Sequence, residues 1–170
     1  MYPASWLAER GIEWSGFFFN PNIHPDREYE LRRGEVLRVA GELDWRIETA
    51  PGDVQEWFAA VEGLAHEPER GSRCRECFAF RLERAFAHAR RYGFAQVTTT
   101  MTVSPFKSSP QIFAVGAELS ARYGIPFLAV DFKKNDGFAK GRLLARRFGV
   151  HLQTHCGCVY SLVAAKLRRR

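Results

Sequence analysis

The chain has 170 residues, of which 46% are hydrophobic and 14% aromatic, and this composition excludes an intrinsically disordered segment. The length suits one full hydrophobic core, so we expect a single domain over residues 1–170 that ends in a basic, mobile tail. No run of about 18 apolar residues occurs, which argues against a membrane-spanning helix. The first residues lack the pattern of a signal peptide, so we expect a cytoplasmic protein without a membrane partner.

The formal net charge of +6 is carried mostly by arginine. Arginine binds phosphate groups through two parallel hydrogen bonds, so the charge is compatible with RNA or another polyanion as a partner. Ordinary solvated helix faces are the alternative explanation. Charge alone therefore leaves a nucleic-acid partner open.

Glycine and proline divide the first third of the chain into short elements. The expected elements are a helix at 5–11 that Gly11 ends, a strand at 12–19, a helix at 26–43, a strand at 45–48 and a helix that begins near residue 54. The turn sequence NPNIHP follows the first strand and stops it.

The clearest helix spans residues 74–92, because its apolar side chains recur on one face and Gly93 follows it. The remaining expected elements are a strand at 96–103, a helix at 110–123, a strand at 126–131 and a basic helix at 138–149. Strands that alternate with helices indicate a parallel sheet with helices on both faces, which binds ligands at the carboxyl ends of its strands. We therefore expect a pocket at FFFNPNIHP and TTTMTVSPFKS.

The four cysteines form two close pairs, Cys74 with Cys77 and Cys156 with Cys158. In a reducing cytoplasm such pairs indicate metal ligands more than a disulfide framework. A redox dithiol and simple core packing are the alternatives. No hydrolase triad, Walker loop or dinucleotide-binding glycine motif is present.

The spacing of each pair suits joint ligation. On a helix, a spacing of three places the sulfurs of Cys74 and Cys77 on one side, and the positive end of the helix favours thiolates. An extended backbone points the side chains of Cys156 and Cys158 the same way, and a glycine between them lets the backbone curl. We expect the two pairs to converge on zinc or an iron–sulfur centre, with His151 and His155 as neighbours of the ligands.

Four motifs taken in order, FFFNPNIHP, CRECFAFRLERA, TTTMTVSPFKS and HLQTHCGCVYS, resemble the QueH type of epoxyqueuosine reductase. The resemblance runs from about residue 12 to residue 161. It implies a Rossmann-like, three-layer fold of the adenine nucleotide hydrolase group with a parallel sheet. It also implies reduction of epoxyqueuosine to queuosine in tRNA, with a 4Fe-4S cluster, an additional iron ion and an unidentified electron donor.

The resemblance assigns roles to named residues but no catalytic residue. It places the four cysteines at the family's metal-binding thiol positions, namely Cys74, Cys77, Cys156 and Cys158. It implies that the loop residues hold the modified nucleoside, namely Asn20, Asn22, His24, Thr99, Ser104 and Lys107.

The sequence departs from the family pattern at its start. Family members begin with a strand followed by Cys-Cys-x-Pro, whereas Met1-Tyr2-Pro3 stands where that motif should have finished. We therefore expect the first central strand and two adjacent thiolates to be missing, through a late-assigned start, a truncation or decay. Four thiolates suffice for one cluster or one zinc ion. A zinc-stabilised, non-catalytic RNA-binding or structural module is the alternative function, and the activity of the truncated chain is left open.

Overall fold

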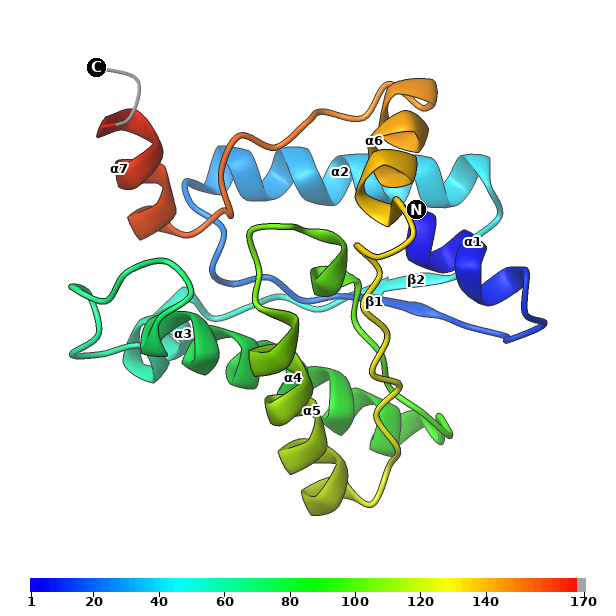
Figure 1. Cartoon of the computed structure of the whole chain (residues 1–170), viewed down its shortest axis with the longest axis horizontal. Coiled ribbons are helices and arrows are strands. Elements are labelled where there is room, and N and C mark those ends of the chain that lie inside the picture. Colours follow the sequence, from blue (N-terminus) through cyan, green and yellow to red (C-terminus); the bar gives the residue numbers. More distant parts are fainter. Residues whose placement is uncertain (168–170) are drawn as a thin grey trace. The chain divides into compact units, whose positions relative to one another are not determined.

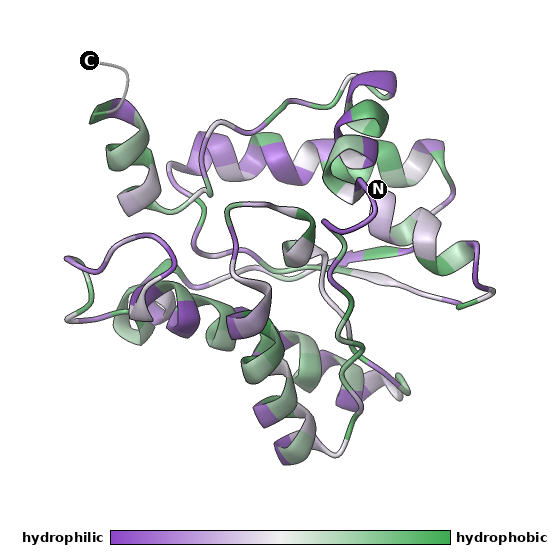
Figure 2. Cartoon of the chain, in the orientation of Figure 1, coloured by the Kyte–Doolittle hydropathy of each residue, from purple (hydrophilic) through white to green (hydrophobic). Residues whose placement is uncertain are grey.

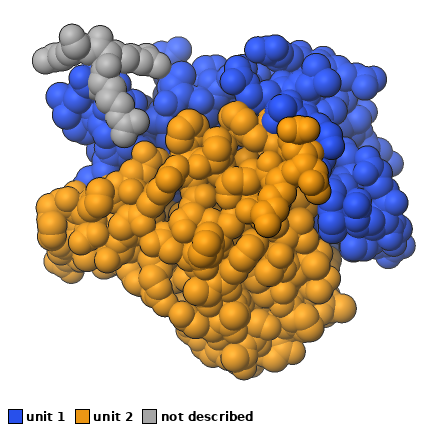
Figure 3. All heavy atoms as spheres, in the orientation of Figure 1, with its two compact units in different colours: residues 1–54, 139–170 blue, residues 55–138 orange. Residues whose placement is uncertain are grey.

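The computed structural model describes residues 1–167 as a mixed α/β chain. It divides into two compact units, which we call unit 1 (residues 1–54 and 139–170) and unit 2 (residues 55–138) (Figure 3). Among residues 1–167, no helix combines the length and the apolar character that crossing a bilayer requires.

Unit 1 contains a two-stranded parallel sheet whose strands are connected by a long helix. Its elements are α1 (Tyr2–Ala8), β1 (Gly16–Phe18), α2 (Asp26–Glu42), β2 (Ile47–Thr49), most of α6 (Gly137–Arg147) and α7 (Val159–Leu167) (Figure 1). Gly16 is paired with Ile47 and Phe18 with Thr49. A parallel pair needs a crossover between its strands, and α2 supplies it. In Figure 2 this helix is largely hydrophilic.

Unit 2 is built around two packed helices. Its elements are α3 (Val54–Ala60), which begins at the unit boundary, α4 (Ser72–Tyr92), the 3₁₀ helix η1 (Thr100–Val103) and α5 (Ser109–Tyr123). One cluster of buried side chains forms the core between them, namely Phe78, Leu82, Phe86, Ala89, Val97, Met101, Ile112, Val115 and Leu119. The apolar stripe of α4 forms one side of this cluster.

The helix α4 ends where its sequence predicts. Gly93 adopts φ +73° in the left-handed region, which glycine enters at no steric cost. The long helices α2, α4 and α5 are confirmed, with boundaries that differ from the expected ones by at most two residues.

The expected strands of unit 2 are largely wrong. Within residues 96–103 and 126–131 the structure has a single parallel bridge, between Val97 and Phe127, and residues 100–103 form η1 instead. The Thr99 hydroxyl accepts a hydrogen bond from the Met101 amide (3.2 Å) and so caps this turn. The threonines of this segment predicted a strand because they are β-branched. In the structure the hydroxyl of Thr99 binds the backbone instead and stabilises a turn. The coarse α/β class with parallel pairing is confirmed.

Candidate functional site

The first cysteine pair lies at the beginning of α4. Cys74 is in the first turn and is half-buried, whereas Cys77 is one turn later and buried. The backbone amide of Arg70 donates a hydrogen bond to the Cys74 sulfur (3.3 Å). The regular hydrogen bonds of the helix thus fix both side chains, and Cys74 is the more accessible of the two.

A buried arginine holds the loop that precedes this pair. Arg73 is 6% exposed, and its guanidinium donates to the carbonyl oxygens of Leu64 (3.1 Å), Ala65 (2.8 Å) and Glu67. A guanidinium carries five donors in a rigid fork, so one side chain can bind several carbonyls of a folded loop. Residues 64–67 are therefore fixed against the first turn of α4.

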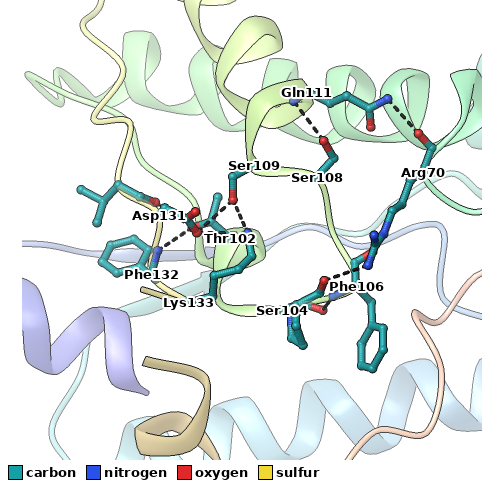
Figure 4. Close-up of polar contacts among 12 residues, drawn as sticks. Arg70, Thr102, Ser104, Phe106, Ser108, Ser109, Gln111, Asp131, Phe132 and Lys133 are labelled. Atoms are coloured by element: carbon teal, nitrogen blue, oxygen red, sulfur yellow. Dashed lines mark hydrogen bonds and ion pairs between the residues drawn. The ribbon is translucent and has the colours of Figure 1, made fainter. Parts of the chain in front are cut away.

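A second arginine connects this pair to the loop after η1. Arg70 adopts φ +73°, and its guanidinium donates to the carbonyl oxygens of Phe106 (3.2 Å) and Pro105 (2.9 Å) (Figure 4). The Gln111 amide donates back to the Arg70 carbonyl (2.8 Å). Residue 70 thus joins the Cys74 sulfur to the TVSPFKS segment. Sequence reasoning missed it, because no local pattern marks a long-range contact of this kind.

The predicted substrate residues of unit 2 surround that same loop. The Thr99 hydroxyl caps η1, and the Ser104 hydroxyl accepts from the Phe106 amide (3.3 Å). Lys107 is half-buried, and its amide donates to the Ser104 carbonyl (3.3 Å). The two hydroxyls act here as acceptors, so each retains its proton to donate to a ligand.

A charged cluster joins the start of α5 to residues 131–133. The Ser109 hydroxyl donates to the Asp131 carboxylate (2.9 Å), and the Lys133 ammonium donates to the same carboxylate (3.0 Å) and to Ser109 (Figure 4). Burial alone would raise the pKa of the Asp131 carboxyl. The hydrogen bonds from Lys133 and Ser109 and the positive charge of Lys133 outweigh burial and lower that pKa. The carboxylate thus stays ionised and joins the start of α5 to residues 131–133.

The second cysteine pair lies on an irregular segment between α6 and α7. Gly157 adopts φ +118°, so the backbone curls between Cys156 and Cys158. Cys158 immediately precedes α7, and its sulfur accepts a hydrogen bond from the Ser161 amide (3.4 Å). The Ser161 hydroxyl donates to the Cys158 carbonyl (2.8 Å). This pair therefore depends on contacts outside regular secondary structure.

Arg32 of α2 contacts this segment from the interior of unit 1. It is 6% exposed and donates to the Gln153 side chain (3.0 Å) and to the carbonyl oxygens of Cys156 (3.1 Å) and His155 (3.2 Å). It also forms an ion pair with Glu28 (2.7 Å). Sequence reasoning missed Arg32 as well, since more than a hundred residues separate it from its acceptors.

The NPNIHP turn lies against the same cysteine segment. The His24 amide donates to the Gly157 carbonyl (2.8 Å), and His24 Nδ1 donates to the Asn22 carbonyl (2.9 Å). Asn22 is 1% exposed, and its side-chain oxygen has no hydrogen-bond partner among the described residues. Asn20 is half-buried, and its carbonyl accepts from the Ile23 amide (3.1 Å).

Each unit thus gathers part of the predicted site. Unit 1 brings the NPNIHP residues to Cys156 and Cys158, and unit 2 brings the TVSPFKS residues to Cys74. In the part of the chain that the structure describes, no group of three or more His, Cys, Asp or Glu side chains is arranged to hold a metal ion. The donor chemistry nevertheless fits a thiolate-bound metal, and the Asn22 side-chain oxygen is an acceptor without a partner among the described residues, in the turn that contacts Gly157.

Comparisons with known proteins agree on one family. A family model described as "Epoxyqueuosine reductase QueH" matches residues 1–164. Proteins named epoxyqueuosine reductase QueH from Thermotoga maritima and Acinetobacter baylyi are 35% identical over 150 residues and 36% identical over 157 residues, which is 86% and 92% of this chain. A Haemophilus influenzae protein of the same name is 36% identical over 157 residues, or 92% of this chain. The matched regions span 78%, 72% and 64% of these three relatives.

Proposed function

The chain belongs to the epoxyqueuosine reductase family QueH, and from this membership we propose that it is an oxidoreductase that reduces epoxyqueuosine to queuosine in tRNA. The observation that carries this proposal is the family match over residues 1–164, which includes both cysteine pairs and both substrate loops. The reduction removes the epoxide oxygen as water and consumes two electrons and two protons. We further propose the Rossmann-like arrangement of the adenine nucleotide hydrolase group for the fold.

For the metal centre we propose thiolate ligation by Cys74, Cys77, Cys156 and Cys158. A 4Fe-4S cluster bound in this way would pass on the electrons of an external electron donor, and an additional iron ion belongs to the same proposal. The amide of Arg70 at the Cys74 sulfur and the amide of Ser161 at the Cys158 sulfur support it, because amide donors of this kind stabilise metal-bound thiolates.

For the nucleoside we propose contacts from both loops. Thr99, Ser104 and Lys107 offer two hydroxyl protons and one ammonium group, which suit the ribose and phosphate oxygens of an RNA loop. Asn20 and His24 offer polar side chains from the NPNIHP turn. The bound ligand would donate a hydrogen bond to the buried side-chain oxygen of Asn22, which has no partner among the described residues.

The alternative is a zinc-stabilised RNA-binding module without redox chemistry, since the same four thiols suit zinc. The deciding experiment purifies the chain anaerobically, measures iron, sulfide and zinc, and tests whether the chain restores queuosine to tRNA in a strain that lacks the reductase. We expect a brown protein that contains iron and sulfide and restores queuosine. A colourless protein with one zinc per chain and no queuosine would replace the reductase with the binding module.

A matched pair of variants makes this experiment specific. Cys158→Ala should lower the iron content and abolish queuosine formation, whereas Ser72→Ala, on an exposed position of α4, should leave both unchanged. If Cys158→Ala retained wild-type iron and activity, Cys158 would not be a ligand.

A further inference from the structure

We propose that Arg32 is a positioning residue for the second cysteine pair: its buried guanidinium holds two carbonyls of the segment that carries Cys156 and Cys158, and so sets the direction of both thiols. The proposal rests on the proposed function only where it treats these thiols as ligands. Arg32 should hold the backbone of residues 153–158 in place whether or not these thiols bind a metal.

Four consecutive carbonyls run through this segment, and each has a donor. Arg32 binds the carbonyls of His155 (3.2 Å) and Cys156 (3.1 Å), and the His24 amide binds that of Gly157 (2.8 Å). The Cys158 carbonyl accepts from α7. Because each carbonyl fixes the orientation of its peptide plane, the four together fix the directions of both cysteine side chains. Arg32 supplies the donors for the first two carbonyls.

The arginine is itself held in place before it meets this segment. Glu28 lies four residues earlier on α2, and its carboxylate binds Arg32 at Nε (2.8 Å) and Nη2 (2.7 Å). Their side chains are only 17% and 7% exposed, so each charge depends on the other for compensation. Glutamate and arginine at this spacing meet on one face of a helix. Glu28 and α2 thus hold the Arg32 guanidinium in position for the cysteine segment.

The segment fits this fork closely. A Cβ atom on Gly157 would lie 3.0 Å from Arg32 Nη1 and 3.1 Å from Ile23 Cγ1. A side chain at residue 157 would therefore be strained at φ +118° and would press on Arg32 and Ile23. This close approach explains why a glycine separates the two cysteines.

The first pair does not depend on Arg32. Cys74 and Cys77 lie within α4, where the hydrogen bonds of the helix orient both side chains. Loss of Arg32 should therefore affect Cys156 and Cys158 and leave Cys74 and Cys77 as an internal control in the same chain.

The test measures the alkylation rate of each cysteine by mass spectrometry on the full chain, as purified and after metal removal with a chelator. In Arg32→Gln we expect both cysteines of the second pair to react about tenfold faster, because the carbonyls of two half-buried residues lose their donor and the segment opens more often. Cys74 and Cys77 should keep their rates. Arg33→Gln is the matched control, since Arg33 is the next residue of α2 and forms an exposed ion pair with Glu30.

Two further variants separate geometry from charge and from unfolding. Arg32→Lys keeps the charge but lacks the fork, so we expect it to resemble Arg32→Gln; wild-type rates in this variant would overturn the proposal. Unchanged rates at Cys156 and Cys158 in Arg32→Gln would also overturn it. If all four cysteines accelerate together because the chain unfolds, Glu28→Gln decides, and the proposal requires it to accelerate the second pair alone.

Metal content gives a readout that distinguishes this proposal from the proposed function. Arg32→Gln should retain less iron than wild type after anaerobic reconstitution, whereas Arg33→Gln should retain as much. If the wild-type chain bound no iron and formed no queuosine, the reductase proposal would fail, and the alkylation rates would still decide the role of Arg32.

Discussion

Gly157 combines two constraints at one residue, a left-handed φ of +118° and close contact on both sides. Gly157→Ala should lower the free energy of unfolding by about 1–3 kcal/mol, because an L side chain is strained at this φ and its Cβ would press on Arg32. Chemical denaturation measures the change. Gly34→Ala, in α2 with nothing within 4 Å, should instead stabilise the chain by about 0.5–1 kcal/mol. A neutral Gly157→Ala would show that the segment moves freely.

Asp131 gives a pH-dependent contribution of predictable sign. Its pKa in the folded chain lies below its ordinary value of 3.8, since the hydrogen bonds and charge of Lys133 and the hydrogen bond of Ser109 outweigh burial. The stabilisation is therefore fully present above pH 3.8 and is lost as the pH falls through the lower folded pKa. Asp131→Asn should be less stable than wild type at neutral pH, and the difference should shrink in acid. Urea unfolding at several pH values measures this.

An exposed aspartate supplies the control for that experiment. Asp44 lies on the surface with φ +51°, a conformation that asparagine also accepts readily. Asp44→Asn should therefore leave stability nearly unchanged across the same pH range. A stability difference for Asp131→Asn that stayed constant into acid would contradict the role of its charge.

At the scale of the elements, α5 approaches the chain segment beside it through a glycine. A Cβ atom on Gly116 would lie 2.3 Å from the ring of Phe127, which packs against Phe86 (6.2 Å between ring centroids). Gly116→Ala should therefore destabilise the chain by about 1–3 kcal/mol, since the ring has to move within a packed core. Thermal or urea unfolding measures the loss. Gly41→Ala, in an open position of α2, should not destabilise it, and equal effects would argue against this packing.

The same elements show how far the sequence predicts the fold. The long helices followed from apolar periodicity, and Gly93 marked an end correctly, because both signals are local. The strands of unit 2 were wrong because the hydroxyls of Thr99 and Thr102 bind backbone groups, and the helix α7 was not predicted. Short strands depend on their neighbours more than on their own residues.

The candidate site divides in the same way. The cysteine spacing identified the thiols, and the motifs identified both loops, since these are properties of short stretches of sequence. Arg32 and Arg70 were not predicted, although each supports a cysteine segment, because the carbonyls that their guanidinium groups bind lie 35 to 124 residues away along the chain. Whether the four thiols share one metal, and whether residues 1–170 form a single domain, stay predictions.

At the scale of the whole molecule, charge is unevenly distributed along the chain. Residues 137–170 contain eight Lys and Arg residues and no Asp or Glu, while the entire chain has a net charge of +6. All positive excess therefore resides in the last fifth of the sequence. A polyanion such as tRNA should be attracted there, with an affinity that falls steeply with salt because binding releases counterions.

Two arginine pairs in matched positions test this prediction. Arg146 and Arg147 lie in the last turn of α6, and Arg147 lies over the ring of Phe148 (5.8 Å to the centroid). Arg90 and Arg91 lie in the last turn of α4, and Arg91 lies over the ring of Tyr92 (5.4 Å to the centroid). All four are exposed. Replacing the α6 pair by glutamine should weaken binding of a tRNA transcript and reduce the slope of log affinity against log salt by about 1–2, since up to two phosphate contacts are lost. Replacing the α4 pair should change both much less, because residues 55–138 carry eleven Lys and Arg residues together with nine Asp and Glu residues. Equal losses for the two pairs would show that tRNA responds to net charge alone rather than to the acid-free end of the chain.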